Sequence, residues 1–172
     1  MKALLLTIGA LAAALSLAVG LSSATAANGS TVAGAKVAVA RSTLGNVLVD
    51  GRGHTLYLFA KDRHGKSSCT GQCAGFWPPL IAAGMPRAVA GAKASLLGTT
   101  KRPDGRLQVT YNHHPLYTFV KDTTKGQTNG EELNAFGAEW YAVSAAGAKV
   151  ERADATSSDS GYPAAGGYGP AY

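Results

Sequence analysis

The stretch VLVDGRGHTLYLFAKD at residues 47–62 recurs sixty residues later as LQVTYNHHPLYTFVKD at residues 107–122, and the two align without a gap. Seven of the sixteen aligned pairs are identical, and they include a tyrosine, a phenylalanine and an aspartate at the same spacing. Each copy then runs on to a tryptophan, Trp77 or Trp140. Because an internal repeat decides the architecture of a chain before any single motif does, the sequence predicts two related structural units.

Each copy has the pattern of a β-hairpin, with short alternating runs on both sides of a polar turn. The expected strands are 47–49 and 54–60 in the first copy, 107–111 and 114–120 in the second, with further strands at about 98–102 and 140–144. Short helices are expected at about 73–77 and 92–97. The sequence therefore predicts an all-β fold with minor short helices, in which two tandem hairpin repeats are related by pseudo-twofold symmetry within one small domain.

The N-terminus has the form of a signal peptide. Lys2 opens an uncharged run rich in Ala and Leu, and residues 24–26, ATA, have the small side chains that a signal peptidase reads. We expect residues 1–26 to be removed by cleavage between Ala26 and Ala27. An uncleaved membrane anchor is the alternative, because about twenty apolar residues span a bilayer. The expected product has no stable membrane anchor and is secreted or lies in the periplasm or cell envelope.

Composition divides the rest of the chain into three parts. Residues 27–41 are small and polar with scattered valines, which predicts a flexible leader with room for one strand near 37–39. Residues 42–150 form the β-rich domain, with the repeats at about 42–80 and 98–144. Residues 151–172 are dominated by Gly, Ala, Tyr and Pro, so they are expected to be a disordered tail.

The charge of the chain restricts its partners. The formal net charge is +6, which becomes +5 once Lys2 is removed with the signal peptide. This balance favours contact with anionic envelope polymers or lipid headgroups, and another envelope protein is the further candidate partner. Nucleic acid is not expected, because the basic residues are scattered and form no cluster interleaved with aromatic residues.

The motif Y-x-F-x-x-D at residues 57–62 and again at 117–122, with CTGQC and FWPPL following the first copy, resembles the bacterial family called secreted repeat of unknown function. That family is marked by a tandem motif of a tyrosine, four residues and an aspartate, and the resemblance spans about residues 42–144. It implies an exported repeat domain but no settled activity. Many members look like lipoproteins, whereas this chain has no lipid-accepting cysteine directly after its signal peptide.

The motif aromatics are two residues apart on a strand, so Tyr57 and Phe59 point to one face, as do Tyr117 and Phe119. One interpretation makes the four rings a stacking surface for a glycan or another flat ligand. The other places them in the core, with each hydroxyl bound to a polar partner. We favour core packing, and we expect the tryptophan after each copy to close the core.

Asp62 and Asp122 each end a strand and precede a turn that contains glycine. At such a position a carboxylate accepts hydrogen bonds from the following N–H groups and holds the bend. The alternative brings the two carboxylates together as an acid/base pair or a hard-cation site. A hydrolase that uses the paired aspartates is a further alternative. The calcium-loop pattern is missing at both sites, and we favour the turn-holding interpretation.

Cys69 and Cys73 are expected to form a disulfide, because an exported protein matures in an oxidising compartment. The alternative is a redox-active or metal-binding thiol pair. Imidazole and thiolate both suit copper and zinc, so the four histidines are candidate metal ligands: His54, His64, His113 and His114. His54 and His114 occupy equivalent positions in the two copies, and for these two we favour a partly buried structural role.

These observations together predict an exported, non-enzymatic binding or structural module of the cell envelope or the secreted fraction, with no cofactor and an unknown ligand. The alternative is an extracytoplasmic redox or metal-binding protein that uses Cys69, Cys73 and the histidines. The sequence has no nucleophile elbow, zinc-protease motif, phosphate loop or dinucleotide fingerprint, so an enzyme is the weaker class.

Overall fold

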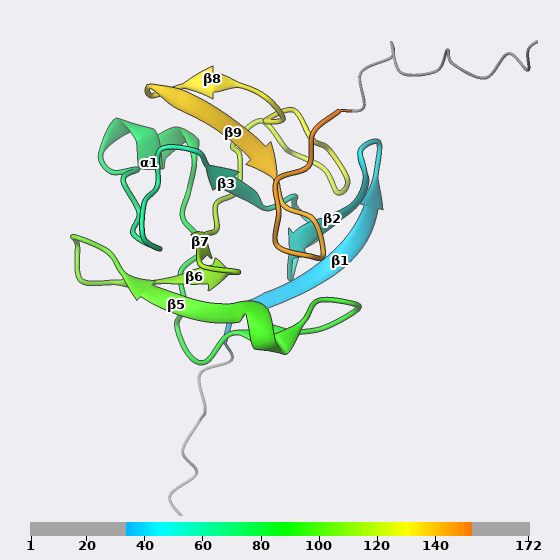
Figure 1. Cartoon of the computed structure of the whole chain (residues 1–172), viewed down its shortest axis with the longest axis horizontal. Coiled ribbons are helices and arrows are strands. Elements are labelled where there is room, and N and C mark those ends of the chain that lie inside the picture. Colours follow the sequence, from blue (N-terminus) through cyan, green and yellow to red (C-terminus); the bar gives the residue numbers. More distant parts are fainter. Residues whose placement is uncertain (1–33, 153–172) are drawn as a thin grey trace, which may run out of the picture. The chain divides into compact units, whose positions relative to one another are not determined.

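The computed structural model describes residues 34–152, and it consists mainly of short strands (Figure 1). The expected signal peptide, about half of the expected leader and nearly all of the expected tail lie outside these residues. In chain order the elements are β1 (Lys36–Ser42), β2 (Gly45–Asp50), β3 (Tyr57–Phe59), α1 (Gln72–Phe76), β4 (Arg87–Ala88), the 3-10 turn η1 (Ala94–Leu96), β5 (Leu97–Lys101), β6 (Leu107–Tyr111), β7 (His114–Pro115), β8 (Asn134–Ala135) and β9 (Ala138–Ala142).

The strands form three small sheets, with the orders β2-β1-β4, β3-β9-β8 and β5-β6-β7. All pairings are antiparallel except that of β1 with β4. Isolated bridges join the sheets, among them Val47 with Ser144 and Tyr57 with Tyr117. The all-β prediction, with minor short helices, is confirmed.

Turn chemistry explains where the strands reverse. Asn112 and His113 both have positive φ, 47° and 66°, which is the geometry of the tight turn that joins β6 to β7. After β2, the carboxylate of Asp50 accepts hydrogen bonds from the N–H groups of Arg52 and His54, at 2.8 and 2.9 Å. Short polar side chains that bind their own turn account for both positions.

Both predicted hairpins are present, but each is shorter than the sequence predicts. In the first copy, β2 pairs along its length with β1, and its hairpin partner is the short segment before β3, through the bridge from Val49 to Thr55 and two flanking backbone hydrogen bonds. β3 itself pairs with β9 of the second copy. In the second copy, the β6–β7 hairpin ends at Pro115. The aromatic segment of each copy therefore pairs with the other copy, and this pairing buries the face that carries the rings.

Two expected boundaries also differ from the structure. The sequence predicts a flexible leader over residues 27–41 with a strand near 37–39, but β1 covers Lys36–Ser42 and is the central strand of its sheet. The helix expected over residues 92–97 is only the 3-10 turn Ala94–Leu96. Valine and alanine alternate in β1, and Val37 is fully buried, so this segment gains its order from packing that a local pattern understates.

The central strands are buried on both faces. Tyr57 and Phe59 point into a cluster that holds all the buried phenylalanine and tryptophan rings of the described residues, together with Cys69 and Cys73. Leu56 and Leu58 point the other way, into a mainly aliphatic cluster: Val37, Leu48, Val109, Tyr111, Leu116, Tyr141 and Val143. Alternation along the strand therefore separates the two clusters, as the period of a β-strand requires.

Four stacked rings form the centre of the aromatic cluster, in the order Phe59, Trp140, Trp77, Phe119. Their centroids are 4.0, 3.9 and 4.2 Å apart, with interplanar angles of 7°, 3° and 21°. Tyr57 meets Trp77 edge-on at 5.4 Å, and Tyr117 meets Trp140 edge-on at 5.1 Å. The equivalent residues of the two copies thus occupy equivalent places on either side of the tryptophan pair.

This stack predicts a large and shared energetic role for the tryptophans. Trp77 and Trp140 are 1% and 0% exposed, so replacing either with alanine should lower the free energy of unfolding by about 3 to 5 kcal/mol. Because the two rings contact each other, the double variant should cost less than the sum of the single variants. Chemical denaturation measures all three, with Phe76→Ala at an exposed ring as the control. Additive costs would contradict a shared stack.

Candidate functional site

The two copies of the motif meet at their tyrosines. The N–H of Tyr57 donates to the carbonyl of Tyr117 at 2.8 Å, and the N–H of Tyr117 donates back to the carbonyl of Tyr57 at 3.0 Å. Both side chains are fully buried. The same residue of each copy is therefore paired with its equivalent, which places the local symmetry axis between them.

The side chains of the motif are exchanged across this axis. The hydroxyl of Tyr57 donates to the carboxylate of Asp122 at 2.6 Å, and the hydroxyl of Tyr117 donates to that of Asp62 at 2.7 Å. The tyrosine of each copy thus binds the aspartate of the other. The tyrosine and the aspartate that the motif places five positions apart belong to two different hydrogen bonds.

The second carboxylate oxygen of each aspartate binds the segment that follows it. Oδ1 of Asp62 accepts hydrogen bonds from the N–H and the hydroxyl of Ser68, at 2.7 and 2.8 Å. Oδ1 of Asp122 accepts a bond from the N–H of Asn129 at 2.9 Å. The structure thus places the two carboxylates in separate hydrogen-bond networks, each with a turn on one oxygen and a tyrosine on the other.

Burial controls the protonation of these groups. It raises the pKa of Asp62 and of Asp122, while the hydrogen bonds that each carboxylate accepts act in the opposite direction. Burial, together with the neighbouring carboxylate, raises the pKa of Tyr57 and Tyr117 far above that of a free phenol. Both hydroxyls therefore keep their protons and act as donors at any physiological pH.

A buried arginine extends the network around Asp62. Arg102 is 4% exposed, and its guanidinium donates to the hydroxyl of Ser67, the side-chain oxygen of Gln108 and the carbonyl of Cys69 at 2.6 to 2.8 Å. The hydroxyl of Tyr117 also lies 2.8 Å from that of Ser67. The Asp62 side of the site is therefore also bound to β6, through Gln108, and to the residue that follows β5, Arg102. No sequence motif marks this arginine as a buried residue.

Cys69 and Cys73 form a disulfide, as expected, with their Cα atoms 5.3 Å apart. The two residues are 0% and 7% exposed and pack in the cluster that contains Trp77. The disulfide joins α1, which contains Cys73, to the loop whose residues form hydrogen bonds with Asp62 and Arg102. In this state neither sulfur is a thiol.

Three of the four candidate histidines lie near one another. His64, His113 and His114 line one pocket together with Asp62, whereas His54 lies apart, with Nδ1 at 3.6 Å from the carboxylate of Asp50. Burial lowers the pKa of His114, while the charge of Asp62 raises it. Among residues 34–152, no three histidine, cysteine, aspartate or glutamate side chains gather closely enough to hold a metal ion.

The structure also contains an aromatic cleft that the sequence analysis missed. The cleft encloses about 260 Å³ between the end of α1 and the region of β8, and its lining is almost entirely apolar: Phe76, Trp77, Phe119, Lys121, Leu133, Ala135 and Phe136. Phe76, Leu133 and Phe136 are 44%, 39% and 37% exposed. One sequence signal could have indicated the cleft. Phe136 directly precedes Gly137, and a tight turn at this place favours asparagine and not a large aromatic residue.

The rim of the cleft is basic. Lys121 lines it directly, and the ammonium of Lys61, the equivalent residue of the first copy, donates to the carbonyl of Phe136 at 3.2 Å. None of the described lining residues is acidic. The cleft therefore combines an apolar floor with positive charge at its edge.

A buried carboxyl group lies in the same region of the chain. Glu131 is 4% exposed, and one of its oxygens accepts a hydrogen bond from the N–H of Ala142 at 2.6 Å. The other oxygen, Oε1, has no hydrogen-bond partner among the described residues. Burial raises the pKa of Glu131 to about 7.

The exchanged hydrogen bonds predict which residues are energetically coupled. Tyr57→Phe and Asp122→Ala remove the same bond, so the double variant should cost about 1 to 2 kcal/mol less than the sum of the single variants. Tyr57→Phe combined with Asp62→Ala removes two different bonds and should be additive within about 0.5 kcal/mol. Urea denaturation measures both cycles. Stronger coupling of Tyr57 to Asp62 than to Asp122 would refute the exchange.

The carboxyl of Glu131 predicts a pH dependence of stability. Its folded-state pKa of about 7 lies above the ordinary 4.5, so between these values the folded state holds a proton that the unfolded state has released. The free energy of unfolding should therefore fall as the pH rises through this window, by on the order of 3 kcal/mol from this group. Glu131→Gln should remove that part of the slope in melts at a series of pH values. An unchanged slope would contradict the buried carboxyl as its source.

Comparison with curated proteins and with solved structures finds no match for this chain. No helix in the described part of the chain is long and apolar enough to cross a membrane. A family described as a secreted repeat of unknown function matches residues 38–81 and again residues 98–144. Each matched segment contains one copy of the motif, and together they cover more than half of the chain. The chain therefore belongs to this family of secreted repeats, as its motif indicated.

Proposed function

We propose that this protein works outside the cytoplasm as a non-enzymatic binding module, and that the cleft between α1 and β8 is its ligand site. The observation that carries the proposal is the exposure of three large apolar side chains, Phe76, Leu133 and Phe136, around one cleft. Grouped exposure of this kind marks an interaction site more often than a single exposed side chain does. Export itself is proposed to depend on the signal peptide expected over residues 1–26.

The backbone of Phe136 supports a functional role for its ring. Phe136 and Gly137 form the two-residue turn between β8 and β9, with φ values of 58° and 89°. A bulky residue rarely adopts such a conformation, whereas asparagine or glycine does so at little cost. Strain of this kind at an exposed residue is expected where the side chain serves a purpose other than stability.

The floor of the cleft is rigid. Trp77 and Phe119 belong to the four-ring stack, and Phe76 follows Cys73 in α1 by one helical turn, so the disulfide restrains its position. A ligand that binds here loses little free energy to ordering of the protein, because the site is already formed.

Charge and shape together define the proposed ligand class. The apolar floor suits an aromatic or aliphatic group, and Lys121 and Lys61 at the rim suit a negative charge on the same molecule. Anionic amphiphilic molecules of the cell envelope and aromatic side chains beside a carboxylate have this chemistry. The overall charge favours anionic partners, and the cleft favours those anionic partners that also carry an apolar group.

A hydrolytic role finds less support. All four carboxylate oxygens of Asp62 and Asp122 accept hydrogen bonds from tyrosine hydroxyls, backbone N–H groups or a serine, which leaves them poorly placed to move a proton. The redox or metal alternative needs the thiols of Cys69 and Cys73, whose sulfurs are joined and buried. The binding interpretation is the one that the exposed side chains favour.

Two dyes test the cleft directly. Anilinonaphthalene sulfonate, which is aromatic and anionic, should bind the folded protein, and Phe136→Asn should weaken its binding by about tenfold through loss of ring contact. The same substitution should leave the free energy of unfolding unchanged or raise it by up to about 1 kcal/mol, because asparagine tolerates positive φ. Fluorescence titration and thermal melts measure the two effects.

Matched controls separate the cleft from general hydrophobic binding. Met85→Ala, at a residue that is 84% exposed elsewhere, should leave dye binding unchanged. Lys121→Gln should weaken the anionic dye about two- to fivefold and leave neutral N-phenylnaphthylamine unaffected, whereas Lys66→Gln should change neither. If Phe136→Asn binds the anionic dye as well as the wild type does, the cleft is not the site.

A further inference from the structure

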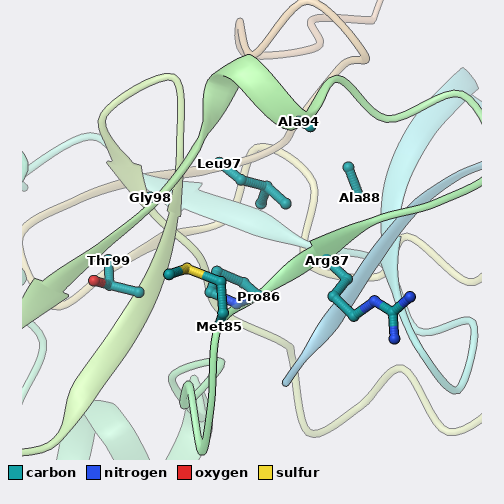
Figure 2. Close-up of a pocket in the computed structure, with 8 residues that line it drawn as sticks. All are labelled: Met85, Pro86, Arg87, Ala88, Ala94, Leu97, Gly98 and Thr99. Atoms are coloured by element: carbon teal, nitrogen blue, oxygen red, sulfur yellow. The ribbon is translucent and has the colours of Figure 1, made fainter. Parts of the chain in front are cut away.

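Two sheets end at open edges on either side of a second groove, which is distinct from the aromatic cleft. β4 is an edge strand of the sheet β2-β1-β4, and β5 is an edge strand of the sheet β5-β6-β7. Residues of both strands line one groove of about 400 Å³. Figure 2 shows Met85 and Leu97 extending into the space between the two strands.

The hydrogen bonds at both ends of β5 show which of its backbone groups face outward. The N–H of Asn112 donates to the carbonyl of Leu96, and the N–H of Arg102 donates to the carbonyl of Arg106. In an antiparallel pair, alternate residues bond to the partner, so even-numbered residues of β5 bond to β6. The N–H and C=O groups of Thr99 and Lys101 therefore point away from the sheet, whereas the N–H of Leu97 donates to the carbonyl of Ala94. Within the described range these groups of Thr99 and Lys101 have no backbone partner.

β4 presents its backbone in the same way. The N–H groups of Arg87 and Val89 donate to the carbonyls of Ala35 and Val37 at 2.9 Å, so the odd-numbered residues bond to β1. The N–H and C=O of Ala88 then face away from β1. In the residues that the structure describes, the groove is thus bordered by unpaired strand backbone on two sides.

An exposed strand edge is a template for another strand, and proteins that do not use such an edge cover it or protect it. The side chains here protect it against one kind of partner only. Arg87 in the groove and Lys101 on β5 are exposed, and no acidic residue lines the groove. A second copy of this chain would bring the same positive charges together, whereas an acidic strand would be attracted.

We propose that the edge of β5 accepts an extended acidic segment of a partner protein as an added strand. Thr99 and Lys101 would supply its main-chain hydrogen bonds, and the apolar surface of Met85, Pro86 and Leu97 would receive one of its apolar side chains. Main-chain pairing gives affinity in this mode of recognition, and a side-chain pocket gives specificity. The proposal goes beyond the aromatic cleft and does not depend on it.

The test uses a short fluorescein-labelled peptide with valine and threonine at its centre and glutamates at both ends. It should bind the full-length mature protein, measured by fluorescence anisotropy, at least about tenfold more tightly than a peptide with lysine in place of each glutamate. A peptide with N-methylated backbone amides should not bind. On binding, amide exchange should slow at Thr99 and Lys101.

Substitutions at the edge make the test specific. Thr99→Pro removes one outward N–H at an exposed position and should weaken the acidic peptide by about tenfold, whereas Thr99→Val keeps that N–H and should bind normally. If the proline variant does not fold, the amide exchange of the wild type decides. Phe136→Asn should not affect this peptide. Equal binding by folded Thr99→Pro, slowed exchange confined to residues outside β5, or pairing of two copies through β5 would each overturn the proposal.

Discussion

Two hydrogen bonds from buried tyrosines to aspartates hold the halves of this domain together, and each bond joins one copy of the repeat to the other. A phenol or a carboxylate that is buried without a partner costs more free energy than a satisfied pair contributes. The copies therefore cannot separate without exposing or orphaning all four groups. The tryptophan stack lies directly against this pair of bonds, so polar satisfaction and aromatic packing depend on the same arrangement of strands.

Most of the local structure could be predicted from the sequence, because period-two alternation and turn residues act over a few positions. Tyr57 and Phe59 share a face, and Asn112 and His113 turn the chain, as the pattern indicated. Which strand pairs with which could not be predicted from these local patterns. The alternation of β3 is identical whether it pairs with β2 or with β9, and only burial of the rings in three dimensions selects β9.

The candidate site was predicted less well than the fold. The motif residues drew attention because they repeat, yet their side chains are occupied in holding the copies together. The exposed residues of the cleft do not repeat. Phe76 comes from the helix after the first copy, and Phe136 comes from a turn in the second, so no single stretch of sequence contains both. Arg102 and Glu131 were missed for a related reason, since charged side chains are expected at the surface and only the folded structure shows that these two are buried.

The exchange of partners between the copies has a consequence for how such a domain could originate. A single copy would leave its own tyrosine and its own aspartate without partners, and two identical copies would satisfy both by forming a symmetric dimer. A tandem chain converts that dimer into one molecule, in which the linker keeps the second half at a high effective concentration. Once the halves are covalently joined they no longer need to be identical, and one of them is free to acquire a disulfide while the other supplies a strained turn.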